Sequence, residues 1–160
     1  MLNPKLPGGI KSRDKKELID WIVRTGKYYT SALLPNDIER GEIGECFDTC
    51  ALRVAHHVFV KGKAKYRYVE GVAMCFAGTD RLDKLKGIWV LHAWLTDGVH
   101  AFDTTWLTLN PQGKEVAMPA IYVGFEMKIK QVVDFMAKTK YQGILANGWR
   151  APELAEKSFL

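Results

Sequence analysis

The chain has 160 residues, of which 48% are hydrophobic and 26% charged, and its formal net charge is +5. This length predicts one domain over residues 1–160, and the composition is typical of soluble globular proteins. No apolar run approaches the roughly 20 residues that span a bilayer, and the N-terminus lacks the apolar block of a secretory signal. We therefore expect a cytoplasmic protein with no membrane partner.

The positive charge comes mainly from lysine clusters within residues 11–16, 61–65 and 84–86. These clusters coincide with predicted helix starts and turns, where solvated charge is common, and they are not interleaved with aromatic residues as in nucleic-acid-binding surfaces. We do not expect a nucleic-acid partner. An acidic substrate or partner surface is compatible with the charge.

The first half of the chain predicts mainly helices. Residues 14–26 have apolar residues at helical spacing, with Ser12 as a candidate N-cap, and residues 27–34 predict a second short helix. A polar loop over residues 36–44 leads to a buried helix over residues 45–60.

The second half predicts mainly strands. The first is at residues 66–76, where Gly71 indicates a bulge or a close backbone approach. Two strands at residues 88–96 and 99–106 are joined by Asp97-Gly98, a strong hairpin signal.

A further strand is expected at residues 121–129, a closing helix at residues 131–139 and a short helical stretch at residues 153–157. Helices followed by strands indicate an α+β fold. We expect the helix that carries Cys46 to lie centrally, packed on an antiparallel β-sheet.

Three short segments carry the residue types of a thiol-dependent active site: Gly44-Glu45-Cys46, His92-Ala93-Trp94 and Asp103-Thr104-Thr105-Trp106. A cysteine at a helix start, a histidine on a strand and an aspartate on the next strand can act as nucleophile, base and orienting carboxylate. A helix N-terminus stabilises a thiolate, and its free N–H groups could hold an oxyanion.

The hairpin register supports this grouping. A two-residue turn at Asp97-Gly98 would place Thr96 opposite Val99 and therefore His92 opposite Asp103. Residues that are directly opposed project to the same face of a sheet, with Cβ atoms about 5 Å apart. We expect this face, which includes Trp94, to meet the Cys46 helix.

The three motifs together resemble the transglutaminase-like branch of the papain-like cysteine protease superfamily, over residues 42–106. The chain is also similar to small phage-type proteins. The resemblance implies a papain-like core and a catalytic triad in which Cys46 is the nucleophile, His92 the base and Asp103 the orienting group.

Three neighbouring residues are assigned to the substrate cleft: Trp94, Asn36 and Glu45. Trp94 would cover the thiol and exclude water. Asn36 or the Tyr28-Tyr29 pair could supply an oxyanion donor by position, and His100 is the alternative base.

Three cysteines in a chain without a secretory signal predict free thiols. We expect Cys50 and Cys75 to be core thiols. No second Cys/His pair at zinc-finger spacing and no calcium-loop pattern is visible, so neither a metal nor a cofactor is expected.

The leading hypothesis is a cysteine-dependent acyl-transfer enzyme that acts on an amide bond of a protein or peptide, as a protease, peptidase, glutamine deamidase or transglutaminase. One alternative is a catalytically inactive binding module, such as a small inhibitor of a host or cellular protein. Another is a small-thioester acyltransferase. A deep apolar pocket against Trp94 would favour the thioester donor, and an open groove would favour a peptide; the oligomeric state stays open.

Overall fold

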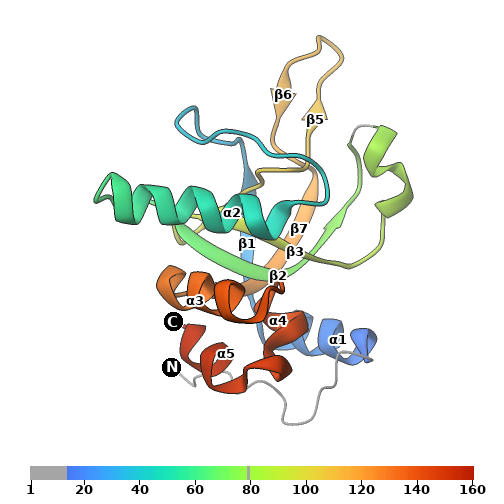
Figure 1. The fold of residues 1–160 in the computed structure, drawn as a ribbon. Helices are drawn as coiled ribbons and strands as arrows, with labels where there is room; N and C mark the ends of the chain where they lie inside the picture. The colour runs from blue at the N-terminus through green and yellow to red at the C-terminus, as the bar shows by residue number, and fades with distance from the viewer. Residues whose placement is uncertain (1–13, 79) are drawn as a thin grey trace.

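The structure, a computed structural model, describes residues 14–78 and 80–160 and is built around a small β-barrel (Figure 1). The barrel strands are β1 (Lys27–Ala32), β2 (Arg67–Cys75), β3 (Val90–Thr96), β4 (His100–Phe102) and β7 (Ala120–Met127). Their order around the barrel is β1-β4-β3-β2-β7, and β7 pairs with β1 to close it.

The expected antiparallel sheet under a central helix is therefore wrong. β1 pairs in parallel with β4 and antiparallel with β7, so the strands close into a mixed barrel and the helices lie outside it. Closure gives every barrel strand two neighbours and removes the exposed edges of an open sheet.

The short helix expected at residues 27–34 is also wrong, because this segment forms β1. Tyr29 is buried while its neighbours Tyr28 and Thr30 are exposed, which is the period-two pattern of a strand rather than that of a helix. The burial of Tyr29 inside the barrel outweighs the local preference.

Side chains fill the interior of the barrel. All five strands contribute to one buried cluster, whose strand members are Tyr29, Val69, Ala73, Cys75, Trp94, Ala101 and Tyr122. On the barrel wall, Gly71 is paired with Gly124, and a Cβ on Gly71 would lie 2.5 Å from the Gly124 Cα. Of the two roles predicted for Gly71, the structure shows the close approach.

The helix α2 (Cys46–Ala55) continues into a π-helical turn, η1 (His56–Val60), and covers the outside of the barrel. Its buried residues Cys50, Ala51 and Val54 share a cluster with Ala93 and Leu95 of β3. Because side chains alternate along a strand, α2 packs on the face of β3 opposite to the one that carries Trp94.

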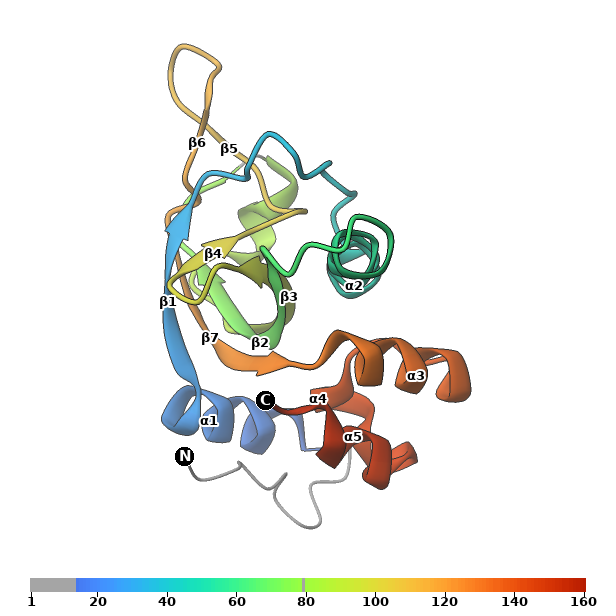
Figure 2. The ribbon, with the colours of Figure 1, turned by 90° about the vertical axis from the view of Figure 1, so that its left-hand side faces the viewer.

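The remaining helices gather on another side of the barrel (Figures 1 and 2). They are α1 (Lys15–Thr25), α3 (Ile129–Thr139), α4 (Ile144–Asn147) and α5 (Pro152–Ser158), with a 3₁₀ turn, η3 (Gly148–Arg150), between the last two. None of the helices described has the length and apolar character that crossing a bilayer requires. The N-cap of α1 is Asp14, and the predicted Ser12 lies outside the described residues.

The opposite end of the molecule carries a two-stranded ribbon of β5 (Thr108–Leu109) and β6 (Glu115–Val116), which projects beyond the barrel (Figure 1). A 3₁₀ segment, η2 (Asp80–Leu85), follows β2. The sequence did not predict the ribbon, because its strands have only two residues each.

Candidate active site

Cys46 is the first residue of α2, where the loop from β1 ends. Gly44 has a φ of 95°, a left-handed conformation that favours glycine, and it turns the chain into the helix. No side chain caps α2, so the N–H groups of its first turn remain available to an anion near the sulfur. Cys46 itself is 7% exposed.

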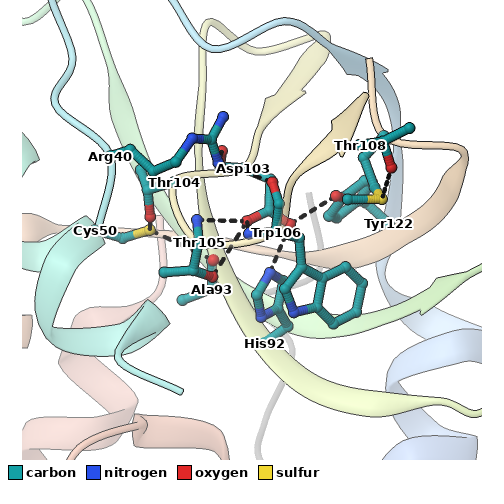
Figure 3. Close-up of polar contacts among 11 residues, drawn as sticks. Arg40, Cys50, His92, Ala93, Asp103, Thr104, Thr105, Trp106, Thr108 and Tyr122 are labelled. Atoms are coloured by element: carbon teal, nitrogen blue, oxygen red, sulfur yellow. Dashed lines mark hydrogen bonds and ion pairs between the residues drawn. The ribbon is translucent and has the colours of Figure 1, made fainter. Parts of the chain in front are cut away.

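His92 lies on β3 and connects Cys46 with Asp103. Its Nε2 is 2.7 Å from Oδ2 of Asp103 (Figure 3). Cys46 also lies close enough to the imidazole to help raise the pKa of His92. The structure therefore brings together the three residues that the sequence assigned to a triad.

Asp103 is held on both carboxylate oxygens. Oδ1 accepts hydrogen bonds from the backbone N–H groups of Thr105 at 3.0 Å and Trp106 at 2.9 Å, and Oδ2 accepts one from the Tyr122 hydroxyl at 2.7 Å as well as from His92. These donors fix the carboxylate in one orientation, which in turn fixes the imidazole ring.

The electrostatics of the pair favour a protonated histidine. Burial alone would lower the pKa of His92, but the charge of Asp103 and the interaction with Cys46 outweigh it and raise the pKa from 6.5 to about 10. Burial raises the pKa of Asp103, whereas the nearby imidazolium and the hydrogen bonds lower it below its ordinary value. At neutral pH the pair is therefore an imidazolium beside a carboxylate.

Aromatic rings surround the imidazole. Trp106 stacks on His92 with ring centroids 4.2 Å apart (Figure 3). The rings of Trp94 and Tyr122 lie further out, with centroids 6.4 and 6.3 Å from that of the imidazole. Both His92 and Trp106 are almost fully buried. The rings keep water away from the His92–Asp103 pair and strengthen its electrostatic interaction.

The route by which these residues meet differs from the expected one in two respects. β3 and β4 pair with Thr96 opposite Ala101, so the register is two residues from the one predicted. A shift of two keeps His92 and Asp103 on the same face, and their contact survives. That face is the barrel interior and not the face covered by α2, so Cys46 reaches His92 from the N-terminal end of the helix.

The residues assigned to the substrate cleft are not brought together. Trp94 is fully buried in the barrel interior, so it lines no open cleft. Asn36 is exposed in the loop before α2, and Glu45 is exposed at the N-cap position.

The other candidate donors and the alternative base are accounted for elsewhere. The Tyr29 hydroxyl donates to Glu126 at 3.3 Å, and Tyr28 is exposed on β1. Nδ1 of His100 is 2.9 Å from the Asp97 carboxylate in the hairpin turn.

The other two thiols are buried, as predicted. The Cys50 thiol donates to the carbonyl of Ala93 at 3.4 Å and lies 3.1 Å from the Thr104 hydroxyl. Burial raises the pKa of the thiols of Cys50 and Cys75. Within the described residues neither thiol has an imidazole partner, whereas Cys46 lies near His92.

Arg40 joins the segments that carry Cys46 and Asp103, and it is not among the residues that the sequence indicates for the site. Its guanidinium donates to the carbonyl of Trp106 at 2.8 Å and forms an ion pair with Glu115 on β6. The next residue, Gly41, donates its N–H to the carbonyl of Thr104 at 2.9 Å. These partners are more than 60 positions away in sequence, so no local pattern could have indicated them.

An open groove of about 650 Å³ borders both segments. It is lined by Arg40, Gly41, Glu42, Ile43, Arg81, Thr105 and Leu107. The loop from 40 to 43 leads directly to Cys46, and Thr105 donates its N–H to Asp103. Residues that line the groove are thus close in sequence to Cys46 and Asp103.

Within residues 14–78 and 80–160, no group of three or more His, Cys, Asp or Glu side chains is arranged to hold a metal ion. No family model, no curated protein and no solved structure matches this chain.

Proposed function

We propose that this protein is a cysteine-dependent acyl-transfer enzyme that acts on an amide bond of a polypeptide, with Cys46 as nucleophile, His92 as acid and base, and Asp103 as the orienting carboxylate. The observation that supports it most is the 2.7 Å contact between His92 and Asp103, with Cys46 close enough to the imidazole to help raise its pKa. The order of these residues also motivates the proposed kinship with the transglutaminase-like branch, which rests on the three motifs alone.

Each step of the proposed reaction is assigned to one of these groups. An imidazolium beside Cys46 stabilises the thiolate, which attacks the carbonyl carbon of the amide. The first-turn N–H groups of α2 face the developing oxyanion. His92 then gives its proton to the leaving amine as the C–N bond breaks, and a thioester forms on Cys46.

Resolution of the thioester reverses the proton transfer. His92 takes a proton from water, the hydroxide attacks the thioester carbonyl, and the C–S bond breaks to release the acid and the thiolate. Hydrolysis needs water alone, whereas transamidation needs a second amine substrate. Hydrolysis is therefore the leading form of the proposal.

The shape of the surroundings favours a polypeptide over a small thioester donor. The space around Trp94 is filled by Tyr29 and Tyr122, with ring centroids 5.7 and 5.2 Å from that of the indole. No deep apolar pocket opens against Trp94 among its described neighbours, while the groove beside the triad is open.

One observation favours an inactive binding module as the second candidate. Cys46 is only 7% exposed, so little of its surface is open to a substrate carbonyl. In that case the triad would serve packing only, and its thiol would be no more reactive than a core thiol.

Alkylation with iodoacetamide across pH 5 to 9, followed by mass mapping of each thiol, separates the two candidates. We expect Cys46 in the folded protein to react at least about tenfold faster at pH 7 than Cys50 or Cys75. The same protein unfolded in urea is the control, since there the three thiols should react at similar rates. Equal rates in the folded protein would remove the basis of the enzyme proposal.

A further inference from the structure

The groove that borders the triad is unevenly charged. Its lining holds two guanidinium groups, Arg40 and Arg81, and one carboxylate, Glu42, beside the apolar side chains of Ile43 and Leu107. The two arginines differ in how firmly they are held. Arg40 is fixed by the Trp106 carbonyl and by Glu115, so its charge is already compensated.

Arg81 is the cation that is free to change partner. It lies on η2, and its guanidinium is 3.7 Å from the Glu42 carboxylate. The two side chains are 75% and 78% exposed, and an ion pair this exposed contributes little to stability. A carboxylate placed in the groove can therefore replace Glu42 at little cost.

We propose that this groove binds an acidic segment of the polypeptide substrate, with Arg81 contacting an Asp or Glu side chain close to the amide that Cys46 attacks. This inference rests on the proposed function, because it concerns the substrate of the same site. The net charge of +5 acts in the same direction, since it attracts acidic polypeptides over a longer range. Ile43 and Leu107 add apolar contact for the residues that flank the acidic one.

Residues that line the groove are close in sequence to Cys46 and to Asp103. Ile43 lies three residues before Cys46, and Thr105 lies two residues after Asp103. Gly41 bonds to Thr104 and joins the two segments into one floor. A polypeptide in the groove thus runs alongside the segments that supply the nucleophile and the orienting carboxylate.

Two short probes that differ in one group can test the inference: chloroacetyl-Gly-Glu-Gly-amide and chloroacetyl-Gly-Gln-Gly-amide. Each alkylates a thiolate with loss of chloride, and the ratio of their rates at Cys46 reports the preference for a carboxylate. At low salt we expect the Glu probe to react about threefold faster than the Gln probe. In Arg81→Glu the ratio should fall to one or below, and in Glu42→Gln it should rise.

Lys84→Glu is the matched control, because Lys84 lies on the same segment, is exposed and does not line the groove. It makes the same change in net charge, so it should lower the ratio clearly less than Arg81→Glu. Arg81→Gln tests the same contact without introducing a negative charge and should also lower the ratio.

Equal ratios in Arg81→Glu and Lys84→Glu would overturn the inference, as would a wild-type ratio of one or below. In both cases the Gln probe still alkylates Cys46, and the proposed function stands. If neither probe modifies Cys46 of the wild type, the proposed function fails and the inference fails with it.

Discussion

Two carboxylates are buried on opposite faces of the barrel wall, and their surroundings differ. Asp103 follows β4 and lies with the interior residues, 5% exposed, beside His92. Glu70 is fully buried on β2, where Oε1 accepts from the Tyr68 hydroxyl at 2.8 Å and Oε2 accepts from the N–H of Leu145 at 2.9 Å. Only Asp103 has a cation as a partner.

That partner reverses the effect of burial. Burial raises the pKa of Glu70, and its hydrogen bonds to neutral donors only partly compensate. The pKa of Asp103 is lowered, because the imidazolium and the hydrogen bonds to the carboxylate together outweigh the effect of burial. Glu70 joins β2 to the start of α4 and fits a structural role, whereas Asp103 holds a charge beside an ionisable base, as an active site requires.

The sharpest test of this difference is Asp103→Asn, matched with Glu70→Gln. Loss of the charge beside His92 lowers the pKa of the imidazole and weakens the thiolate, so alkylation of Cys46 at pH 7 should slow by at least about tenfold. Stability should fall by about 3 kcal/mol, because one partner of a buried ion pair is removed. Alkylation rates and urea unfolding measure both effects.

Glu70→Gln should leave the alkylation rate of Cys46 within about twofold of the wild type, since Glu70 faces the outside of the barrel wall. If both variants slowed alkylation equally, the assignment of separate roles to the two carboxylates would be wrong.

The pH dependence of stability gives an effect of similar size. The pKa of His92 is about 10 in the folded protein, against an ordinary 6.5. The stability that the charged His92 contributes is therefore complete below pH 6.5 and is lost as the pH rises toward 10, on the order of 5 kcal/mol in all. Urea unfolding of the wild type and of His92→Gln at pH 6, 8 and 10 measures it.

The difference in the free energy of unfolding between the wild type and His92→Gln should decrease steadily from pH 6 to pH 10, because the variant has no imidazole to titrate. A gap that stays constant from pH 6 to 10 would show that His92 is not charged in the folded protein.

Much of the fold follows from local patterns, but its closure does not. The helical spacing of the apolar residues in α2 and the β-branched and aromatic residues of β2 and β7 are enough to predict these elements within a few residues. The local sequence of β1 predicts a helix. Its strand conformation depends on pairing with β7 and β4, which lie about 70 to 95 residues away in sequence. A barrel that closes through one short strand therefore leaves little trace in any sequence window.

The site follows the same rule. The contact of His92 with Asp103 was predictable because a hairpin fixes which face each residue occupies, and it tolerated a register error of two residues. Tyr122, which bonds the same carboxylate, lies on β7 across the barrel, and its bond could not be inferred before the strand order was known.

Arg40 and Arg53 offer a smaller comparison, since both hold the loop before α2. Arg40 bonds to Trp106 and Glu115, beside the triad, whereas Arg53 bonds to the carbonyl of Glu39 at 3.1 Å, away from it. Arg40→Met should lower the free energy of unfolding by about 1 to 2 kcal/mol and slow the alkylation of Cys46 severalfold. The reason is that the turn over residues 103–106 loses the hydrogen bond from Arg40 to the Trp106 carbonyl. Arg53→Met should cost less than about 1 kcal/mol and leave alkylation unchanged. Equal slowing in both variants would mean that only the order of the loop matters.

The smallest expected effect belongs to Glu70 and is visible only as a dependence on pH. A carboxyl whose pKa is raised by burial contributes most to stability when it is protonated, below its ordinary pKa of 4.5, and this contribution is lost as the pH rises through the folded value. Glu70→Gln also loses one acceptor, because an amide nitrogen cannot accept from Leu145. The variant should therefore cost about 1 to 2 kcal/mol at pH 4 and less at pH 8, as measured by urea unfolding. A cost that grows with pH would mean that Glu70, like Asp103, is stabilised as an anion, and the contrast between the two carboxylates would be lost.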